Sequence, residues 1–397
     1  MPHRQLTILG IRGIPAMHGG FETFAERLAL HLVQQGWRVT VYCQGAATQV
    51  PAVVEDEWRG VHRITLAVRR QGAPGTIEFD WASIRDAARR RPALALTLGY
   101  NTAVLSTYLR WRGIANLINM DGLEWKRRKW RRHARLWLWL NERVGCWTGD
   151  HLIADHPEIA RHLSTRVSRD KIAMIPYGAD LVGDVDPQPL RALGLEGQSY
   201  GLVIARAEPE NSLLEIVRAF SRRRRDARLV VLGRYEPESN DYHRQVLEAA
   251  SEEVDFPGAI YDLDALRVLR RYARFYAHGH TVGGTNPSLV EALGAANAVI
   301  AHDNPFNRWV AQDGARYFRS ETECDMHMSV LLADGATVQA MRALSLQRFE
   351  REFRWSAILT QYQALLESHL QAPALAPAAQ PALALAQAMT VKRGREG

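Results

Sequence analysis

This chain of 397 residues is poor in cysteine and has neither long apolar runs nor an acidic excess. Its three cysteines, Cys43, Cys146 and Cys324, are an odd number spread far apart. This excludes a disulfide framework and a cysteine metal motif, and it favours a reduced, cytoplasmic setting. The uncharged stretch 92–109 is broken by proline, glycine and polar residues, whereas a membrane-spanning helix needs ~20 largely apolar residues. The opening MPHRQLTILG passes directly into a predicted strand, so we expect no signal peptide.

What the chain has instead is a composition typical of folded domains and a surplus of positive charge. Hydrophobic residues make up 47% and charged residues 23% of the sequence, which excludes a disordered chain and collagen. The length suggests two or three domains. The formal net charge of +7 predicts anionic partners. Five of the eleven tryptophans lie between Trp125 and Trp147, beside a basic cluster at 126–135.

Short β-branched or aliphatic runs alternate with helical patterns, which predicts parallel α/β layers. We therefore expect two doubly wound, Rossmann-like domains at 1–180 and 181–345, a C-terminal helix at 346–370, and a disordered Ala/Pro-rich tail at 371–397. The predicted strands are 6–10, 38–44, 93–99, 115–121, 151–155 and 171–176 in the first domain, and 200–206, 227–233, 254–258, 274–279 and 298–302 in the second.

A glycine-rich loop, GIRGIPAMHGG, follows the first predicted strand. Gly19 and Gly20 lie where the next helix begins, so backbone amides there could bind an anion. The dinucleotide fingerprint G-x-G-x-x-G is absent, and the second strand ends at Gln44 without an acidic residue, which disfavours NAD. A tight turn without a ligand is the alternative interpretation. Among the histidines, only His18 in this loop is singled out as a candidate.

The second domain opens with VIARAEPEN. Arg206 leaves the end of a predicted strand, where open α/β sheets bind their ligands, and Asn211 follows at the entrance of the next helix. An arginine there can bind a diphosphate through two parallel hydrogen bonds. The alternative is a surface ion pair of Arg206 with Glu208 or Glu210.

The stretch 280–293, HTVGGTNPSLVEAL, is the most informative one. Its glycines admit a sugar close to the backbone, and free amides at a helix start suit a phosphate. The carboxylate of Glu291 suits the paired hydroxyls of a ribose. An ordinary helix cap with a solvated Glu291 is the alternative. The candidate donor-binding residues of this stretch are Gly283, Gly284, Thr285, Asn286, Ser288 and Glu291.

Four ordered motifs resemble the rhamnosyltransferase-like branch of glycosyltransferase family 4, and the resemblance extends over about residues 6–370. These motifs are GIRGIPAMHGGFETF, MDGLEWKRRKW, ARAEPEN and VGGTNPSLVEAL with AHDNPFNR after it. The resemblance implies the GT-B fold, with an N-terminal acceptor-side domain, a C-terminal nucleotide-sugar domain and a last helix that returns to the first domain. It further implies retaining sugar transfer from a nucleotide diphosphate-sugar such as dTDP-L-rhamnose, without a metal or other cofactor. The implied acceptor is a lipid-linked saccharide in cell-envelope polysaccharide synthesis.

Two positions depart from the broader family. Its usual first glutamate is Gly283 here, and the lysine of its diphosphate pair is Asn211. A UDP-hexose or UDP-N-acetylhexosamine therefore remains an alternative donor. We expect Asp121, Arg206 and Glu291 to carry catalysis, with Asp121 orienting the acceptor hydroxyl or contacting the donor sugar. A structural turn is the alternative role for Asp121.

The basic cluster combines arginines with tryptophans. Arg128, Arg131, Arg132 and Arg135 have the spacing of one helix face, which could lie on the anionic inner face of the cell membrane. Alternatively, the segment is a basic surface helix packed by its tryptophans. Binding of nucleic acid by a non-catalytic protein is the least favoured reading, because no nucleic-acid module accompanies it. The candidate membrane residues are these four arginines with Trp137 and Trp139.

Overall fold

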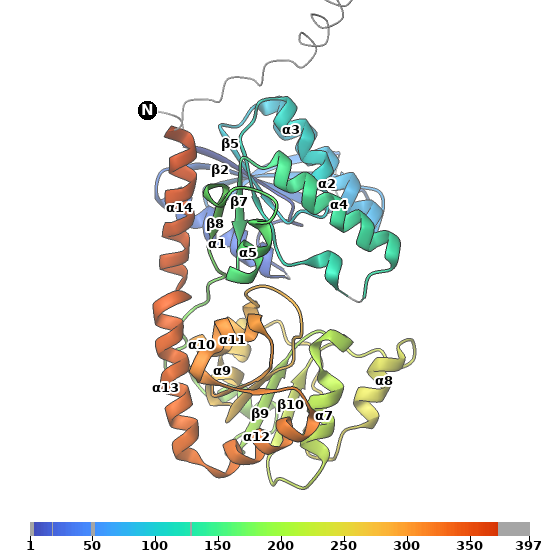
Figure 1. Ribbon diagram of the computed structural model, residues 1–397, viewed down its shortest axis with the longest axis vertical. Helices are drawn as coiled ribbons and strands as arrows, with labels where there is room; N and C mark the ends of the chain where they lie inside the picture. Colours follow the sequence, from blue (N-terminus) through green and yellow to red (C-terminus); the bar gives the residue numbers. More distant parts are fainter. Residues whose placement is uncertain (1–3, 18, 49–51, 128, 372–397) are drawn as a thin grey trace, which may run out of the picture.

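The computed structural model describes residues 4–17, 19–48, 52–127 and 129–371. His18, Arg128 and the predicted tail from 372 onward lie outside the described residues. Two α/β domains follow each other along the long axis of the molecule (Figure 1). This arrangement confirms the predicted fold class: two Rossmann-like domains, each built on a largely parallel sheet, face each other across a cleft.

An eight-stranded sheet forms the centre of the first domain. Its middle strands are aliphatic because helices cover both faces, and every residue of 94–98 is buried. The sheet order is β3 (Val53–Trp58), β4 (Val61–Val68), β2 (Arg38–Ala46), β1 (Gln5–Leu9), β5 (Leu94–Leu98), β6 (Asn116–Asn119), β7 (His151–Ala154) and β8 (Ile172–Met174). Its helices are α1 (Gly20–Gln34), α2 (Gly72–Arg90), α3 (Thr107–Trp111), α4 (Arg132–Thr148) and α5 (Pro157–Leu163), with the 3-10 turns η1 (Ala103–Ser106), η2 (Glu124–Lys126) and η3 (Arg169–Lys171).

The antiparallel hairpin β3–β4 was absent from the predicted strands. β3 reads VVEDEW and lies at the sheet edge, where its acidic side chains face solvent. Arg63 of β4 holds Asp56 at 2.6 Å, and Arg90 of α2 holds Glu55 at 2.5 Å. An edge strand needs no apolar run, so the pattern that reveals the central strands does not reveal this one.

The second domain contains a six-stranded sheet in which all neighbouring strands are parallel. Its last strand, at the edge, was also missed by the sequence prediction. The sheet order is β11 (Val254–Asp255), β10 (Arg228–Leu232), β9 (Tyr200–Ile204), β12 (Phe275–His278), β13 (Val299–His302) and β14 (Ala315–Phe318). Its helices are α6 (Gln188–Ala192), α7 (Leu213–Ser221), α8 (Asp241–Glu248), α9 (Leu263–Tyr272), α10 (Pro287–Gly294), α11 (Pro305–Ala311) and α12 (Glu321–Ala333), with η4 (Pro209–Asn211) and η5 (Gln312–Gly314).

Two C-terminal helices, α13 (Gly335–Glu352) and α14 (Trp355–Gln371), run along one side of both domains (Figure 1). α14 packs on α1, where the rings of Phe24 and Tyr362 lie 4.6 Å apart. The chain thus crosses between the domains twice, and the crossings touch: the amide of Ala179 donates to the carbonyl of Phe353 at 2.8 Å. The exact domain boundaries stay a prediction. No helix in the described part of the chain is long and apolar enough to span a bilayer.

Candidate active site

The cleft lies where the carboxyl ends of the strands in both sheets point toward each other. Gly20 at the start of α1 lies so near α10 that a Cβ on it would be 3.0 Å from Pro287 Cγ. A Cβ on Gly122, after β6, would lie 3.6 Å from the backbone of Gly283. Loops that sequence analysis selected separately in each domain are therefore brought together across one cleft.

Asp121 follows β6 and faces this cleft. Its backbone adopts a left-handed φ of 48°, and its amide donates to the side chain of Asn119 at 3.0 Å. Burial and the neighbouring Glu124 raise the pKa of Asp121 to about 6, whereas the charges of Arg127 and Arg206 lower it. The carboxyl is thus a group that titrates near neutral pH and lies within electrostatic reach of Arg206.

Asp155, at the end of β7, joins the two domains directly. Its Oδ2 accepts a hydrogen bond from the amide of Thr285 at 2.9 Å, and its backbone carbonyl accepts one from the Thr285 hydroxyl. Its Oδ1 is buried without a hydrogen-bond partner in the described structure. Burial, with the nearby Asp121 second, raises the pKa of Asp155 to about 8. Burial therefore favours the protonated form of Asp155 near neutral pH, although the hydrogen bond from the Thr285 amide favours the ionised form.

A second bridge crosses the cleft through Arg127. Its guanidinium donates to Glu210, in the 3-10 turn η4 of the second domain, and to Glu124 at 2.6 Å. Arg127 keeps a raised pKa because these two carboxylates outweigh its burial, and the pKa of Glu210 is lowered by the same bond despite burial. The alternative interpretation of Arg206, an ion pair with Glu210, is not what the structure shows, because Glu210 pairs with Arg127.

Arg206 is exposed at the carboxyl end of β9 and forms no ion pair with another described residue. Its backbone carbonyl accepts hydrogen bonds from the amide of Glu208 at 2.7 Å and from the side chain of Asn211 at 2.8 Å. Asn211 is buried, so it shapes the turn that presents Arg206 and does not itself face the cleft. Its side-chain amide is used within the fold, and its role in donor binding stays a prediction.

Two amides of the 283–291 stretch are already occupied. The Thr285 amide donates to Asp155, and the Ser288 amide donates to the side chain of Asn286, which caps α10 at 3.0 Å. The expectation of free amides at these two positions was wrong, because an interdomain contact and a helix cap satisfy them. A Cβ on Gly283 would meet nothing within 4 Å, so open space remains beside its backbone. Gly284 has no such space, since a Cβ there would lie 2.2 Å from Asp155.

Glu291 and Ser288 lie on α10, one turn apart. The carboxylate of Glu291 is partly exposed and pairs with Arg270 of α9, a nearly buried arginine. The hydroxyl of Ser288 bonds to Tyr276 at 2.5 Å and to the carbonyl of Ile204 at 3.2 Å, which ties α10 to the sheet. Glu291 is therefore only partly solvated, and its carboxylate already has an ion-pair partner.

Two cavities lie along the cleft and share Lys126 and Val282 in their walls. One, about 390 Å³, extends toward α5 and is lined by Glu124, Arg127 and Gly283 among others. The other, about 630 Å³, extends toward α7. Both have residues of each domain in their walls. Within the described residues, no group of three or more His, Cys, Asp or Glu side chains is placed to hold a metal ion.

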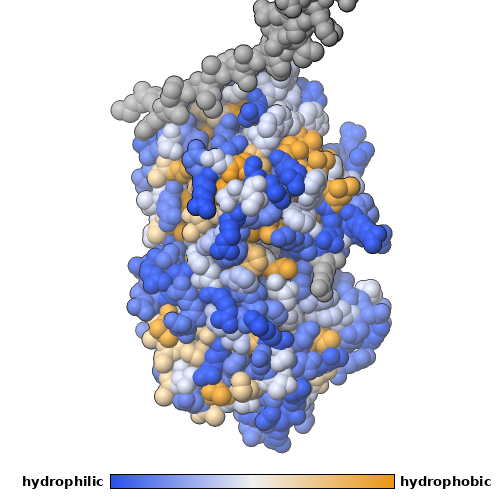
Figure 2. Space-filling view, in the orientation of Figure 1, coloured by the Kyte–Doolittle hydropathy of each residue, from blue (hydrophilic) through white to orange (hydrophobic). Residues whose placement is uncertain are grey.

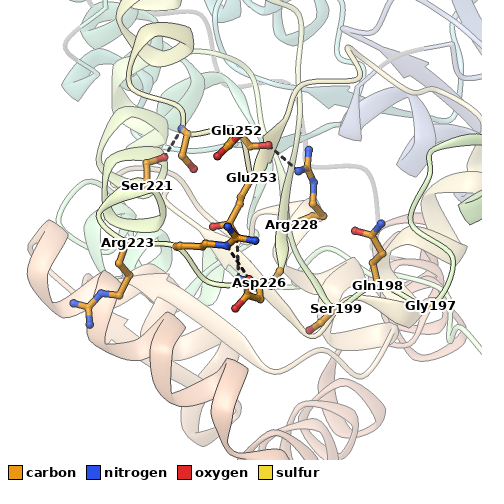
Figure 3. A pocket seen from close by; sticks show the side chains of 12 residues that line it. Gly197, Gln198, Ser199, Ser221, Arg223, Asp226, Arg228, Glu252 and Glu253 are labelled. Carbon is orange, nitrogen blue, oxygen red and sulfur yellow. Dashed lines mark hydrogen bonds and ion pairs between the residues drawn. The ribbon is translucent and has the colours of Figure 1, made fainter.

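A cavity of about 700 Å³ lies elsewhere, at the amino ends of β9 and β10 (Figure 3). Its arginines already have partners: Arg224 pairs with Asp226 at 2.9 Å, and Arg228 pairs with Asp255. The carboxylate of Glu253 accepts backbone hydrogen bonds there at 2.8 Å. Because parallel sheets bind ligands at their carboxyl ends and these charges are compensated, this cavity is no candidate for the site.

The predicted basic stripe does not lie on one helix. α4 begins only at Arg132, Arg131 precedes it with extended backbone, and Arg128 lies outside the described residues. The residues before α4 form the loop that brings Arg127 to Glu210, so the helical spacing predicted from Arg128 onward was wrong.

The remaining candidates of the stripe lie on α4. Arg135 is exposed, and its Nε donates to the carbonyl of Trp125 at 2.9 Å. Trp137 donates to the carbonyl of Asn101 at 2.9 Å, which holds α4 against the loop before η1. The ring of Trp139 is covered by the guanidinium of Arg143 at 4.0 Å.

Sequence reasoning missed Asp155 and Arg127, and it named Glu210 only as an alternative partner of Arg206. Asp155 could have been found, because it follows a predicted strand just as Asp121 does, at the edge of the sheet where ligands bind. The ion pair of Arg127 with Glu210 joins residues of different domains, and no local signal reveals such a pair.

Comparisons with known proteins support the fold. A family described as "Domain of unknown function (DUF1972)" matches residues 3–180. No curated protein matches the sequence. Among solved structures, sucrose-phosphate synthase from Thermosynechococcus elongatus has a TM-score of 0.79 at 18% identity, covering 92% of this chain and 99% of that one. HepE from Anabaena in complex with UDP has a TM-score of 0.70 at 14% identity, covering 92% and 100%. An α,α-trehalose-phosphate synthase from Burkholderia vietnamiensis has a TM-score of 0.70 at 13% identity, again covering 92% and 100%.

Proposed function

We propose that this chain is a retaining glycosyltransferase that uses a nucleotide diphosphate-sugar as donor. The observation that carries the proposal is Arg206, an exposed guanidinium at the carboxyl end of β9 that has no ion pair among the described residues. It lies within electrostatic reach of Asp121 across the cleft. A cation without a counter-ion suits the diphosphate of a donor, whose departure it would stabilise. The similar structures, among them one named as bound to UDP, support the same choice of ligand.

In the proposed reaction, the oxygen of an acceptor hydroxyl forms a bond to the anomeric carbon while the bond from that carbon to the diphosphate breaks. The electron pair leaves with the diphosphate, and the hydroxyl proton passes to the leaving phosphate oxygen. Arg206 stabilises the charge that develops on the diphosphate, and the ionised Asp121 accepts a hydrogen bond from a hydroxyl of the donor sugar. Glu291, whose carboxylate pairs with Arg270, is proposed to accept hydrogen bonds from the ribose hydroxyls.

The donor sugar is proposed to be L-rhamnose carried by dTDP, and the acceptor a lipid-linked saccharide of the cell envelope. The motifs of the sequence support this choice. So does the open space at Gly283, since no carboxylate is present there to bind further sugar hydroxyls. A UDP-hexose or UDP-N-acetylhexosamine is the second candidate donor. It is favoured by the similarity to HepE, which is 15% identical in sequence and whose structure is named as a complex with UDP-glucose.

The test is a screen of dTDP-rhamnose beside UDP- and GDP-sugars by thermal shift and by turnover. We expect dTDP-rhamnose to stabilise the protein most and to release dTDP when an acceptor is supplied. Arg206→Ala should abolish the thermal shift, whereas Arg234→Ala should leave it unchanged. Arg234 is the matched control, because it follows the neighbouring strand β10 but pairs with Glu236 at 2.8 Å. A UDP-sugar that alone binds and turns over would replace the proposed donor, and unchanged binding in Arg206→Ala would refute the site.

A further inference from the structure

Large apolar side chains are exposed on three adjacent helices of the first domain. Trp111, Leu136 and Trp147 have 76%, 65% and 60% of their surface exposed. α3 packs against both α2 and α4, so the three helices form one surface. Figure 2 shows apolar patches among hydrophilic residues over the upper domain, on the side where Figure 1 places α3 and α4. We call this surface the tryptophan face, and its exposed apolar residues are Ile77, Trp81, Trp111, Leu136, Leu140 and Trp147.

The exposure follows from the helical spacing on α4. Leu136, Leu140 and Trp147 lie at positions i, i+4 and i+11, on one side of the helix. Leu138 and Cys146, on the opposite side, are buried against the sheet. α4 is thus apolar on two sides, and only one of them is used within the fold.

Aromatic contacts join α3 to its neighbours across this face. The rings of Trp81 and Tyr108 lie 5.5 Å apart, and those of Tyr108 and Trp111 lie 5.7 Å apart. The guanidinium of Arg110 lies over the ring of Trp147 at 5.3 Å. The exposed rings are therefore held in place, so little conformational freedom would be lost on binding a partner.

Three arginines of the face lack counter-ions in the described structure, whereas Arg110 pairs with Asp150 at 4.0 Å. Arg112, Arg132 and Arg135 form no ion pair with any residue in the described ranges, unlike the paired arginines of the second domain. The one acidic residue of α4, Glu142, is buried and binds His162 at 2.9 Å. The surface therefore combines apolar side chains with unpaired cations, and an anionic partner would be needed to neutralise it.

We infer that the tryptophan face docks on the anionic surface of a lipid bilayer. Tryptophans prefer the boundary between headgroups and acyl chains, leucines and isoleucines enter it, and arginines bind the phosphates above it. A nucleic acid offers no apolar environment in which the exposed aliphatic side chains would be buried. A symmetric contact with a second copy would place like charges opposite each other. The inference rests on exposure and charge and is independent of the proposed sugar transfer.

Docking in this way places the membrane beside the cleft. α4 starts only a few residues after the loop that carries Asp121 and Arg127 into the cleft, and that loop ends at the exposed Trp130 and Arg131. A saccharide on a lipid anchor in the bilayer could thus approach Asp121 from the side of η2 and α4.

The test is flotation of the full chain with vesicles of phosphatidylcholine, alone or mixed with phosphatidylglycerol. We expect the wild type to bind the anionic vesicles roughly tenfold more than the neutral ones. The triple variant Leu136→Gln, Leu140→Gln, Trp147→Gln should lose roughly tenfold of that binding, and Arg132→Gln with Arg135→Gln should lose the preference for anionic lipid. Met326→Gln with Leu344→Gln, exposed apolar residues of α12 and α13, is the control that should bind as the wild type does.

Equal, negligible flotation of the wild type with both vesicles would overturn the inference, as would wild-type binding by the triple variant. If the triple variant changed only the oligomeric state measured by light scattering, or only binding of RNA, the face would serve a different partner and the inference would be wrong. Thermal shift with nucleotide-sugars should be the same for the wild type and the triple variant. Failure of docking and failure of the proposed function are therefore seen in separate measurements.

Discussion

Replacing Asp155 with asparagine is expected to remove the contribution of this carboxyl to the pH dependence of stability near neutral pH. The pKa of this carboxyl is raised from 3.8 to about 8 in the folded protein, first by burial and then by Asp121. Between these values the folded state holds a proton that the unfolded state has lost. Stability is therefore fully present below about pH 4 and falls as the pH rises toward the folded pKa.

The magnitude follows from the same shift. Each pKa unit corresponds to about 1.4 kcal/mol, so the full shift of a completely buried carboxyl would lower the stability of the protein by ~6 kcal/mol over the whole range. Asp155 is partly accessible to solvent, and the Thr285 amide stabilises its ionised form, so we expect a loss of about 1–3 kcal/mol between about pH 5 and pH 8. Asp155→Asn keeps an oxygen for the Thr285 amide but has no charge to titrate. Its stability should thus exceed that of the wild type at the alkaline end.

The assay is urea unfolding of both proteins at several pH values, followed by circular dichroism. Glu248→Gln is the control, because Glu248 is an exposed carboxylate of α8 with no ion pair among the described residues. The difference between Asp155→Asn and the wild type should grow with pH, while the control stays parallel to the wild type. A difference that is constant with pH would show that Asp155 does not hold a proton in the folded state.

Three further changes test the contacts across the cleft. Gly284→Ala should destabilise the protein by ~1–3 kcal/mol in urea unfolding, because the new Cβ would lie 2.2 Å from Asp155. Gly122→Ala is the control, since its Cβ would make only ordinary contacts at 3.6 Å. Equal effects of the two substitutions would contradict the close approach of Gly284 to Asp155. Glu210→Gln should lower the free energy of unfolding by about 1–3 kcal/mol, since Arg127 loses its ionic partner in the other domain. It should also enlarge the radius of gyration measured by X-ray scattering. An unchanged radius would show that this ion pair does not hold the two domains together. Tyr362→Phe should cost ~1 kcal/mol by removing the hydrogen bond from Asn119 at 3.0 Å, and no change in the urea midpoint would refute that contribution.

Sequence patterns predicted the parts of the fold that depend on local burial. The aliphatic runs around β5 and β9 are fully or almost fully buried, which is why they read as central strands. β3 and β14 were missed because edge strands carry charged or short segments that no apolar run marks, whereas β4 was missed although alternate residues of its second half are buried.

The candidate site was predictable only as separate loops. Asp121 and Arg206 were found because each follows a strand, and their chemistry is recognisable in isolation. The use of the Thr285 amide by Asp155 could not be foreseen, since the two residues are 130 positions apart and meet only when the domains pack. That packing, and not residue type, decides which amides remain free for a ligand.

The return of α14 to the first domain affects the order in which the protein can fold during synthesis. Ile358, Leu359 and Leu366 belong to the same core as the strands β1 and β5, although they are made more than 250 residues later. In a nascent chain that ends before α14, the face of α1 that α14 covers is exposed. The first domain therefore emerges early but completes its core last. Until α14 leaves the ribosome, that exposed apolar surface makes the nascent chain prone to aggregation.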